Sequence, residues 1–353
     1  MFDREAGIFS FRVRRDGRAV VREGVSRRYT AITLIGLAAE EPAAAREVLG
    51  GRSVADAADA LARSAGAPDS IGDLALIAWA SSLAGADTNA IWRLIEERQP
   101  EAQSYPTVEV AWALSAAVAD ERLRDARLRD ALASRLRSAM SSHGIFPHAL
   151  GLGTANGPDA TGSKSQRSHV SCFADLVYPV LALSQHATLT GDPASTACAV
   201  KGAAAMCRLQ GAEGQWWWHF DYRTGRVLER YPVYAVHQDS MAPMALFAAS
   251  RAGGRSYDSE IAKGLRWLAS APELGGASLV DRSAGIVWRK VARREPGKLS
   301  RYVQAGASRL SPALRAPGLD VLFPPRAIDY EDRAYHLGWV LYTWPGERAA
   351  DWS

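Results

Sequence analysis

The side chains best suited to catalysis are concentrated between residues 214 and 243, in GQWWWHFDYRTGRVLERYPVYAVHQDSMAP. Three consecutive tryptophans are followed there by carboxylates, tyrosines, arginines and histidines. General acid–base chemistry on a glycosidic or enol ether oxygen needs one protonated and one ionised carboxyl group, and a histidine can carry protons near neutral pH. The stretch therefore predicts an acid–base site lined by aromatic rings.

The residues that we expect to act fall into two groups. The candidate catalytic residues are Asp239, His237, Asp221, Tyr234 and Asp332. The candidate ligand-binding residues are Trp216, Trp217, Trp218, Tyr222, Arg223, Glu229, Arg230, Tyr231, Asp175, Glu331 and His336. Aromatic rings can stack on the apolar face of a sugar, and arginine can hold a carboxylate or phosphate.

Several of these residues also have a purely structural interpretation. An aspartate at a helix start can cap backbone N–H groups, which is worth about 0.5–2 kcal/mol, and the apolar neighbours of Asp175 favour that role. The arginines can belong to a solvated surface. Three consecutive tryptophans in an extended segment cannot all face a core, because side chains alternate. We therefore expect Trp217, or Trp216 together with Trp218, to face the ligand.

We expect no metal ion and no cofactor. His143, His148 and His169 could form a metal site, but their spacing is not diagnostic of one. The three cysteines lie outside any CxxC spacing, and their odd number argues against a disulfide scaffold.

The elements that must position these residues are mainly helical. Apolar residues recur with helical spacing in stretches such as VADAADALARSAG. Alternation of apolar and polar residues around Asp16-Gly17 predicts a small β-hairpin over 8–22. Helices are expected at 28–39, 42–49, 53–65, 70–84, 88–98, 107–119, 121–141, 172–190, 193–209, 239–251, 256–271 and 331–343.

The C-terminal half contains an internal repeat. KGAAAMCRLQGAEGQW begins at position 201, and KGLRWLASAPELGGAS begins 62 positions later. DLVYPVLAL and DSMAPMALF begin 64 positions apart, at Asp175 and Asp239, and Asp332 opens a weaker copy, DRAYHLGWVL. Repeat equivalence places these three aspartates on one rim of the fold. A helical hairpin cannot bury its apolar face alone, so stacked hairpins are the expected architecture.

Long extended loops are expected between the helices of each repeat. They span 143–170, 211–238 and 273–330, and the last two contain strand-like runs around a turn.

The stretch from Lys201 to Trp216 resembles the QW-type repeat of the squalene and terpenoid cyclases. In that repeat a helix ends in Gln, and a Gly, any residue and a Trp follow after a few residues. Gln210, Gly214 and Trp216 match it, whereas Pro272 replaces the Gln in the second copy. Similar turns occur in the six-hairpin glycosidases. Both families are α/α toroids, so the resemblance implies an all-α, (α/α)6-type toroid around a central cavity, with short β-hairpin insertions in its loops.

We expect a hairpin-like segment over 1–25 and one toroid domain over 26–353. The 353 residues contain neither a run of about 18 apolar residues nor the apolar region of a signal peptide, so we expect a soluble, cytoplasmic protein. The formal net charge of +4 is mild and the charges are mixed in sign, which argues against a nucleic-acid-binding surface. The sequence does not determine the oligomeric state.

Three functions remain open at this point. The first is a carbohydrate-active hydrolase, lyase or epimerase that uses carboxylate and histidine acid–base chemistry on a small-molecule saccharide. The second is a terpenoid-cyclase-like enzyme with an isoprenoid substrate, although the Asp-x-Asp-Asp acid motif and the Asp-rich metal motif are absent from the sequence. The third is a non-catalytic toroid that binds a glycan, a lipid or a partner protein.

Overall fold

The structure is a computed structural model, and it describes residues 1–123, 126–151, 167–311, 313–314, 316 and 318–352. Every helix expected from the sequence is present, with bounds shifted by only a few residues. The chain divides into two compact units. The first comprises Met1–Gln103, Glu109–Ala133 and Tyr330–Ser353, and the second comprises Ser104–Val108 and Ser134–Asp329.

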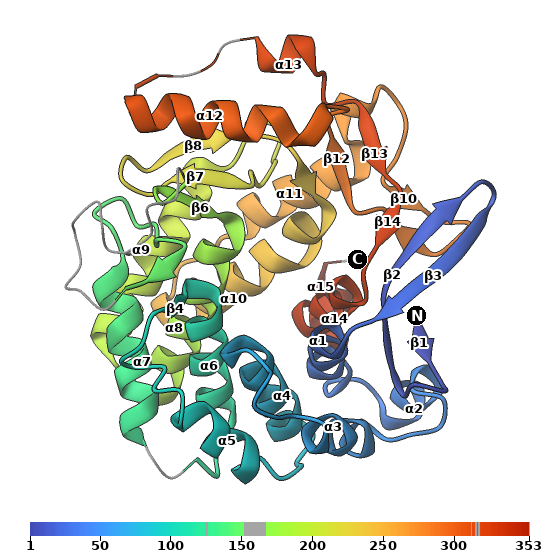
Figure 1. Ribbon diagram of the computed structural model, residues 1–353, viewed down its shortest axis with the longest axis vertical. Coiled ribbons are helices and arrows are strands. Elements are labelled where there is room, and N and C mark those ends of the chain that lie inside the picture. The colour runs from blue at the N-terminus through green and yellow to red at the C-terminus, as the bar shows by residue number, and fades with distance from the viewer. Residues whose placement is uncertain (124–125, 152–166, 312, 315, 317, 353) are drawn as a thin grey trace. The chain divides into compact units, whose positions relative to one another are not determined.

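The first unit combines helices with a small sheet (Figure 1). Its strands are β1 Phe2–Asp3, β2 Ile8–Asp16, β3 Ala19–Val25 and β14 Glu331–Asp332, and its helices are α1 Arg27–Leu37, α2 Pro42–Val48, α3 Val54–Arg63, α4 Ile71–Leu83, α5 Asn89–Glu96, α14 Ala334–Thr343 and α15 Gly346–Asp351. Strands β2 and β3 are antiparallel, with Asp16 opposite Ala19, which confirms the predicted hairpin. Helices α1 and α14 approach closely at Gly36 and Gly338, where an added Cβ would overlap backbone atoms of the other helix.

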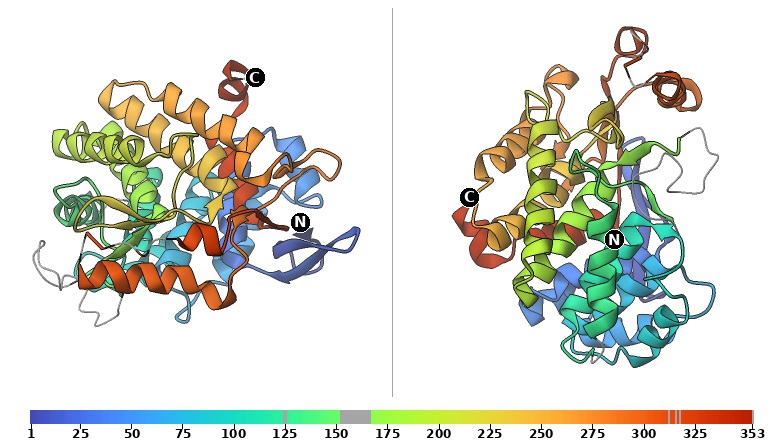
Figure 2. Two further views of the ribbon diagram at one scale, coloured as in Figure 1. Left: turned by 90° about the horizontal axis from the view of Figure 1, so that it is seen from above. Right: turned by 90° about the vertical axis from the view of Figure 1, so that its left-hand side faces the viewer.

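Helices α6 Thr107–Ala119 and α7 Ala126–Ala139 contribute residues to both units. The other helical elements of the second unit are α8 Phe173–Thr190, α9 Pro193–Leu209, the π-helical turn η1 His237–Met241, α10 Ala242–Gly253, α11 Asp258–Ser270, the 3-10 turns η2 Pro272–Leu274 and η3 Pro296–Lys298, α12 Leu299–Leu310 and α13 Leu319–Leu322. Helix α8 packs against α9 and α10, and these helices lie side by side in both views of Figure 2.

Short strands precede the helices of the second unit. They are β4 Tyr105–Pro106, β5 Ala149–Leu150, β6 Val170–Cys172, β7 His219–Asp221, β8 Arg226–Glu229, β9 Val233–Tyr234, β10 Val280–Asp281, β11 Ile286–Val287, β12 Lys290–Ala292 and β13 Ala327–Asp329. They pair as β4–β5, β6–β7–β8, β9–β12–β13 and β10–β11. The strand-like runs predicted within loops 211–238 and 273–330 are thereby confirmed.

The QW-type turn links two neighbouring helices of this unit. Gln210 follows the last residue of α9, and its side-chain amide donates hydrogen bonds to the carbonyl oxygens of Gly214 (3.0 Å) and of Glu260 in α11 (2.9 Å). Gly214 has a φ of 106°, and a Cβ there would overlap the backbone of Lys263. In this motif the Gln side chain therefore links α9 to α11 by hydrogen bonds, and the Gly lets the turn approach the backbone of α11 closely.

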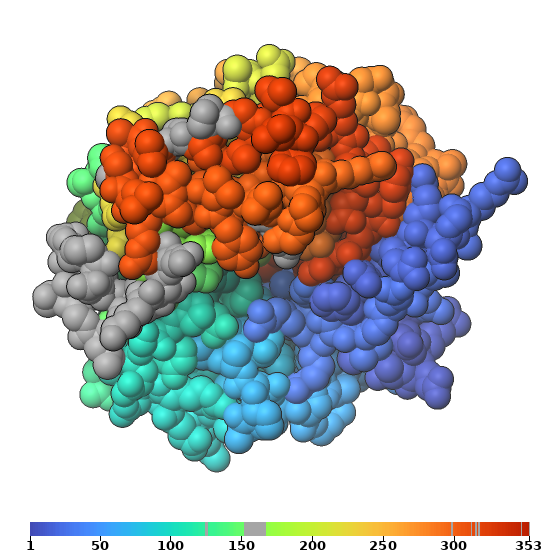
Figure 3. All heavy atoms as spheres, turned by 45° about the horizontal axis from the view of Figure 1, so that its top comes forward, coloured from blue at the N-terminus to red at the C-terminus, as the bar shows by residue number. Residues whose placement is uncertain are grey.

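The prediction of an extended loop over 273–330 was wrong in part, because the segment also forms α12 and α13. Helix α12 packs against β8 through the small apolar cluster of Val170, Leu228 and Ala305. Its outer side leaves Tyr302 and Leu310 exposed, and this segment lies on the surface in Figure 3. The residues that the helix buries, Ser300, Ala305 and Ser308, are small, so the sequence offers no stripe of large apolar side chains there. Of the predicted loop 143–170, residues 152–166 lie outside the described part.

Within the described residues, we find no helix that combines the length and apolarity needed to cross a membrane.

Candidate functional site

At three places in the second unit, the first residue of a helical stretch donates its backbone N–H to a carbonyl oxygen of a loop. The N–H of Thr107 donates to the carbonyl of His148 (3.0 Å), and that of Phe173 donates to the carbonyl of Trp218 (2.8 Å). The N–H of Ala235 donates to the carbonyl of Arg289 (2.9 Å). His148, Trp218 and Arg289 therefore occupy one position of the repeat, and each side chain is held near a helix start.

At the start of α8 the carboxylate of Asp175 is engaged by the protein itself. Asp175 is the third residue of the helix and fully buried, and its Oδ2 accepts the backbone N–H of Cys172, the N-cap residue, at 2.7 Å. The ring of His148, whose side chain is 63% exposed, lies with Nδ1 2.9 Å from Oδ2 and 3.2 Å from Oδ1. Hydrogen bonding to Asp175 raises the pKa of His148. Asp175 caps the helix, as the structural interpretation predicted, but from inside the first turn.

The equivalent start at residue 237 is built differently. Asp239 is the third residue of the turn η1, which continues a helical stretch that begins at Ala235. The turn η1 is π-helical, and the N–H of Ala242 donates to the carbonyl of His237, five residues earlier. Pro243 lacks the N–H that would bond to the carbonyl of Asp239 in an α-helix. Asp239 is half-buried, and its Oδ1 lies 3.0 Å from the hydroxyl of Ser240. π-helical turns are frequent at functional sites.

Aromatic rings surround this second helix start. The ring of His237 lies 4.4 Å from that of Phe173 and 5.0 Å from that of Tyr234, and Tyr234 makes an edge contact with Trp218 at 5.3 Å. Trp216 is buried 5.9 Å from Phe173. The structure thus brings together four predicted site residues: Trp216, Trp218, Tyr234 and His237. Trp216 and Trp218 contact different members of this group, and which tryptophan faces a ligand stays a prediction.

Basic side chains lie against the same rings. The guanidinium of Arg301, from α12, lies 4.5 Å from the centre of Trp218, and its Nε is buried without a hydrogen-bond partner among the described residues. Arg289 and Lys290 each lie 5.3 Å from the centre of Tyr234. Lys290 also pairs with Asp329 at 2.9 Å. These residues form a positively charged border around the tryptophan and the tyrosine.

A second histidine–carboxylate pair lies beside Trp218. Nδ1 of His219 is 3.1 Å from Oε2 of Glu229, both side chains are 4% exposed, and the ring of His219 stacks on Trp218 at 3.9 Å. Burial raises the pKa of Glu229 to about 7, although Arg293 at 3.3 Å opposes the shift. Burial, reinforced by Arg167 at 3.2 Å, lowers the pKa of His219 well below its usual value.

Other predicted residues have mainly structural surroundings. Asp221 is fully buried and forms a two-point ion pair with Arg223 (3.0 and 2.7 Å), which holds its carboxylate in place. Trp217 makes an edge contact with Tyr231 at 5.7 Å, and the exposed Arg230 lies 5.7 Å from its centre. Tyr222 is half-buried, and its backbone N–H donates to the carbonyl of His169 at 3.2 Å.

The remaining predicted residues belong to the first unit. Nδ1 of His336 lies 3.2 Å from Oδ1 of Asp332, which lies in β14 and precedes the N-cap residue Arg333 of α14. Glu331 is buried and pairs with Arg12 at 2.9 Å. Because Asp175 and Asp239 belong to the second unit, a rim shared by all three aspartates stays a prediction.

Sequence reasoning missed His148, Arg289 and Arg301 as parts of this region. His148 was weighed only as a metal ligand together with His143 and His169, but His169 instead lies 2.8 Å from the hydroxyl of Ser308. A usable signal existed, because Gly144 precedes Phe146 as Gly214 precedes Trp216, which would have aligned His148 with Trp218.

No protein-family model and no curated protein sequence matches the chain. Solved structures do. An unsaturated glucuronyl hydrolase specific for heparin is 14% identical with a TM-score of 0.59, and the alignment covers 96% of this chain and 90% of that one. The unsaturated glucuronyl hydrolase from Bacillus sp. GL1, responsible for glycosaminoglycan degradation, is 11% identical with a TM-score of 0.54 and the same coverage. The chain therefore has the all-α, α/α-toroid fold of the six-hairpin glycosidases, as the repeat predicted.

Proposed function

We propose that the protein is a carbohydrate-active enzyme that hydrolyses an acidic saccharide by acid–base chemistry at Asp239. The observation that carries the proposal is the π-helical turn η1, which begins at His237. There the chain places a half-buried carboxylate in a π-helical turn whose first residue, His237, lies against aromatic rings. The likeness to glucuronyl hydrolases supports the proposal through the fold alone.

Asp239 suits the role of proton donor and acceptor better than Asp175 and Asp221. Asp175 is held by the Cys172 N–H and by His148, and Asp221 is held by Arg223. Asp239 lies in the turn η1, where its Oδ1 accepts a hydrogen bond from the hydroxyl of Ser240 at 3.0 Å. Protonation of the bridging oxygen by its carboxyl group would release one sugar, and water would supply the hydroxyl group and proton that complete the products. His237 and Tyr234 would orient the bound sugar.

The border of cations supports an acidic substrate. Arg301 has no carboxylate partner among the described residues, and Arg289 lies over the Tyr234 ring. A planar guanidinium binds a sugar carboxylate through two parallel hydrogen bonds. The same charges disfavour a carbocation intermediate, so a saccharide fits better than an isoprenoid. We also propose that the protein acts in the cytoplasm.

The test is a turnover screen of the purified chain. One panel holds acidic oligosaccharides, including unsaturated glucuronyl disaccharides, a second holds neutral ones, and a third holds prenyl diphosphates and polyenes, with products identified by mass spectrometry. We expect turnover in the acidic panel. Asp239→Asn should lower kcat at least about 100-fold, the range for losing a general acid–base group, with an unchanged melting temperature.

The matched control is Asp258→Asn, which alters an exposed carboxylate in the first turn of α11. Its kcat should equal that of the natural protein. Turnover that survives Asp239→Asn would show that the catalytic residue is wrongly assigned, and turnover of a prenyl compound alone would overturn the proposed function.

A further inference from the structure

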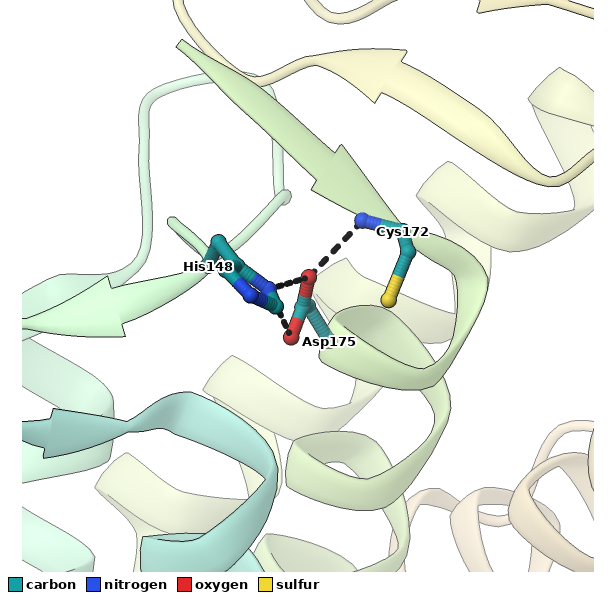
Figure 4. A group of neighbouring side chains, drawn as sticks. All are labelled: His148, Cys172 and Asp175. Carbon is teal, nitrogen blue, oxygen red and sulfur yellow. Dashed lines mark hydrogen bonds and ion pairs between the residues drawn. The ribbon is translucent and has the colours of Figure 1, made fainter. Parts of the chain in front are cut away.

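Three different metal-ligating side chains converge at the start of α8. Among the described residues, His148, Cys172 and Asp175 form the one group of His, Cys and acidic residues whose possible ligand atoms all lie within 4.8 Å of one another. Figure 4 shows the imidazole and the carboxylate facing each other, with the thiol on the same side of the helix start. The three residues come from two segments 24 positions apart, so their spacing in the sequence does not indicate a metal site.

The distances between the imidazole nitrogen of His148 and the carboxylate oxygens of Asp175 are close to those between neighbouring ligands of a bound transition metal. Zinc binds sulfur at about 2.3 Å and nitrogen or oxygen at about 2.0–2.2 Å, so neighbouring atoms of a tetrahedral shell lie roughly 3.3–3.6 Å apart. Nδ1 of His148 already lies 2.9 and 3.2 Å from the two oxygens of Asp175. An ion could therefore replace the proton shared by this pair with a small outward movement of the imidazole. The exposed side chain of His148 has room for that movement.

Backbone hydrogen bonds fix the positions of the three residues. The backbone N–H of Cys172 donates to Asp175, so the residue that supplies the thiol also orients the carboxylate. The carbonyl of His148 is fixed by the N–H of Thr107 at 3.0 Å. Such hydrogen bonds to ligand residues set their orientation and strengthen metal binding. Cys172 forms no disulfide, so its sulfur is available as a ligand.

We propose that His148, Cys172 and Asp175 form a binding site for a thiophilic divalent transition metal such as Zn²⁺. One thiolate, one imidazole and one carboxylate suit zinc or cobalt and not calcium or magnesium, which take oxygen ligands. Three protein ligands leave a fourth position for water. The inference goes beyond the proposed function and does not depend on it, because Asp239 takes no part.

The test uses Co²⁺ as a spectroscopic probe on the chelator-treated full-length protein. Binding through a cysteine sulfur gives a near-ultraviolet charge-transfer band, and a tetrahedral ion gives visible bands. We expect both, with a stoichiometry of one and with bleaching by Zn²⁺. Cys172→Ser should abolish the near-ultraviolet band, and His148→Ala should raise the Kd for Co²⁺ at least 10-fold. Neither variant alters Asp175, so the helix cap is preserved.

Two matched controls separate this site from adventitious binding. Cys198→Ser alters another half-buried free cysteine, and His143→Ala alters another exposed histidine in the same segment. Both should leave the spectrum and the Kd unchanged, and melting curves of all four variants verify folding. The proposal is overturned if no charge-transfer band develops, if the band survives in Cys172→Ser, or if Cys198→Ser removes it.

Discussion

The first turn of α8 and the turn η1 that leads into α10 carry the same short sequence motif, an aspartate followed four residues later by a proline. Each carries an aspartate as its third residue and a proline four residues later, yet the two carboxylates have different surroundings. Asp175 is fully buried, caps an α-helical turn and pairs with His148. Asp239 is half-buried in a π-helical turn without a side-chain cap.

The difference shows how one repeated residue can serve two purposes. A carboxylate that satisfies a backbone N–H and a histidine stabilises the fold and is pre-oriented for a metal ion. The carboxylate of Asp239 does not cap a helix and instead accepts a hydrogen bond from Ser240. The shared motif therefore places an aspartate early in each helical turn, and the loop residues around that aspartate determine which contacts its carboxylate makes.

The largest effect on stability is expected from a substitution in the buried pair of His219 and Glu229. This pair contrasts with the pair of His148 and Asp175 at α8, in which the histidine is exposed. Because burial raises the pKa of Glu229 to about 7, its stabilising contribution is complete below pH 4.5 and is lost as the pH rises through about 7. At pH 8, Glu229→Gln should therefore be more stable than the natural protein by on the order of 3 kcal/mol. The two should be equal near pH 4.5, as urea unfolding across pH can measure.

His219 acts in the opposite sense, because its pKa is lowered and its contribution is lost as the pH falls below about 6.5. Because His219 contacts Glu229 at 3.1 Å, the substitution also changes the titration of His219, so the comparison between about pH 7 and pH 8, where His219 is mostly uncharged, isolates Glu229. A difference that stays constant with pH would show that Glu229 is ionised in the folded protein, as an exposed carboxylate would be.

The capping role of Asp175 predicts a smaller effect. Asp175→Asn removes a charged, buried acceptor and should lower the free energy of unfolding by about 2 kcal/mol. Asp239→Asn should change it by less than about 0.5 kcal/mol, as is usual for a partly exposed position without a cap. Urea titrations with unchanged m values would measure both. Equal losses would remove the distinction between the two helix starts.

The smallest expected effect concerns the cation beside Trp218. Arg301→Gln should raise KM for an acidic saccharide about 5–10-fold at unchanged kcat, because it removes a binding contact that ground state and transition state share. Arg226→Gln, which alters an exposed arginine at the start of β8, is the control and should change neither constant. A loss confined to kcat would assign Arg301 to the reaction itself.

The helices and the repeat could be predicted because apolar spacing and glycine positions record them in the sequence. Helix α12 was missed because it buries little apolar surface and leaves Tyr302 and Leu310 exposed. The group of rings around Tyr234 was predicted in outline, since its members lie close together in the chain. The pairing of His148 with Asp175 could not be, because it depends on how a loop docks onto the next helix start.

The most direct test of the account compares Asp239→Asn and Asp175→Asn side by side, in turnover of the acidic saccharide found in the screen and in urea unfolding. The account predicts that the first variant loses at least about 100-fold in kcat while keeping its stability, and that the second loses stability while keeping the larger share of its kcat. The reverse pattern would contradict it and would place the catalytic carboxylate on α8.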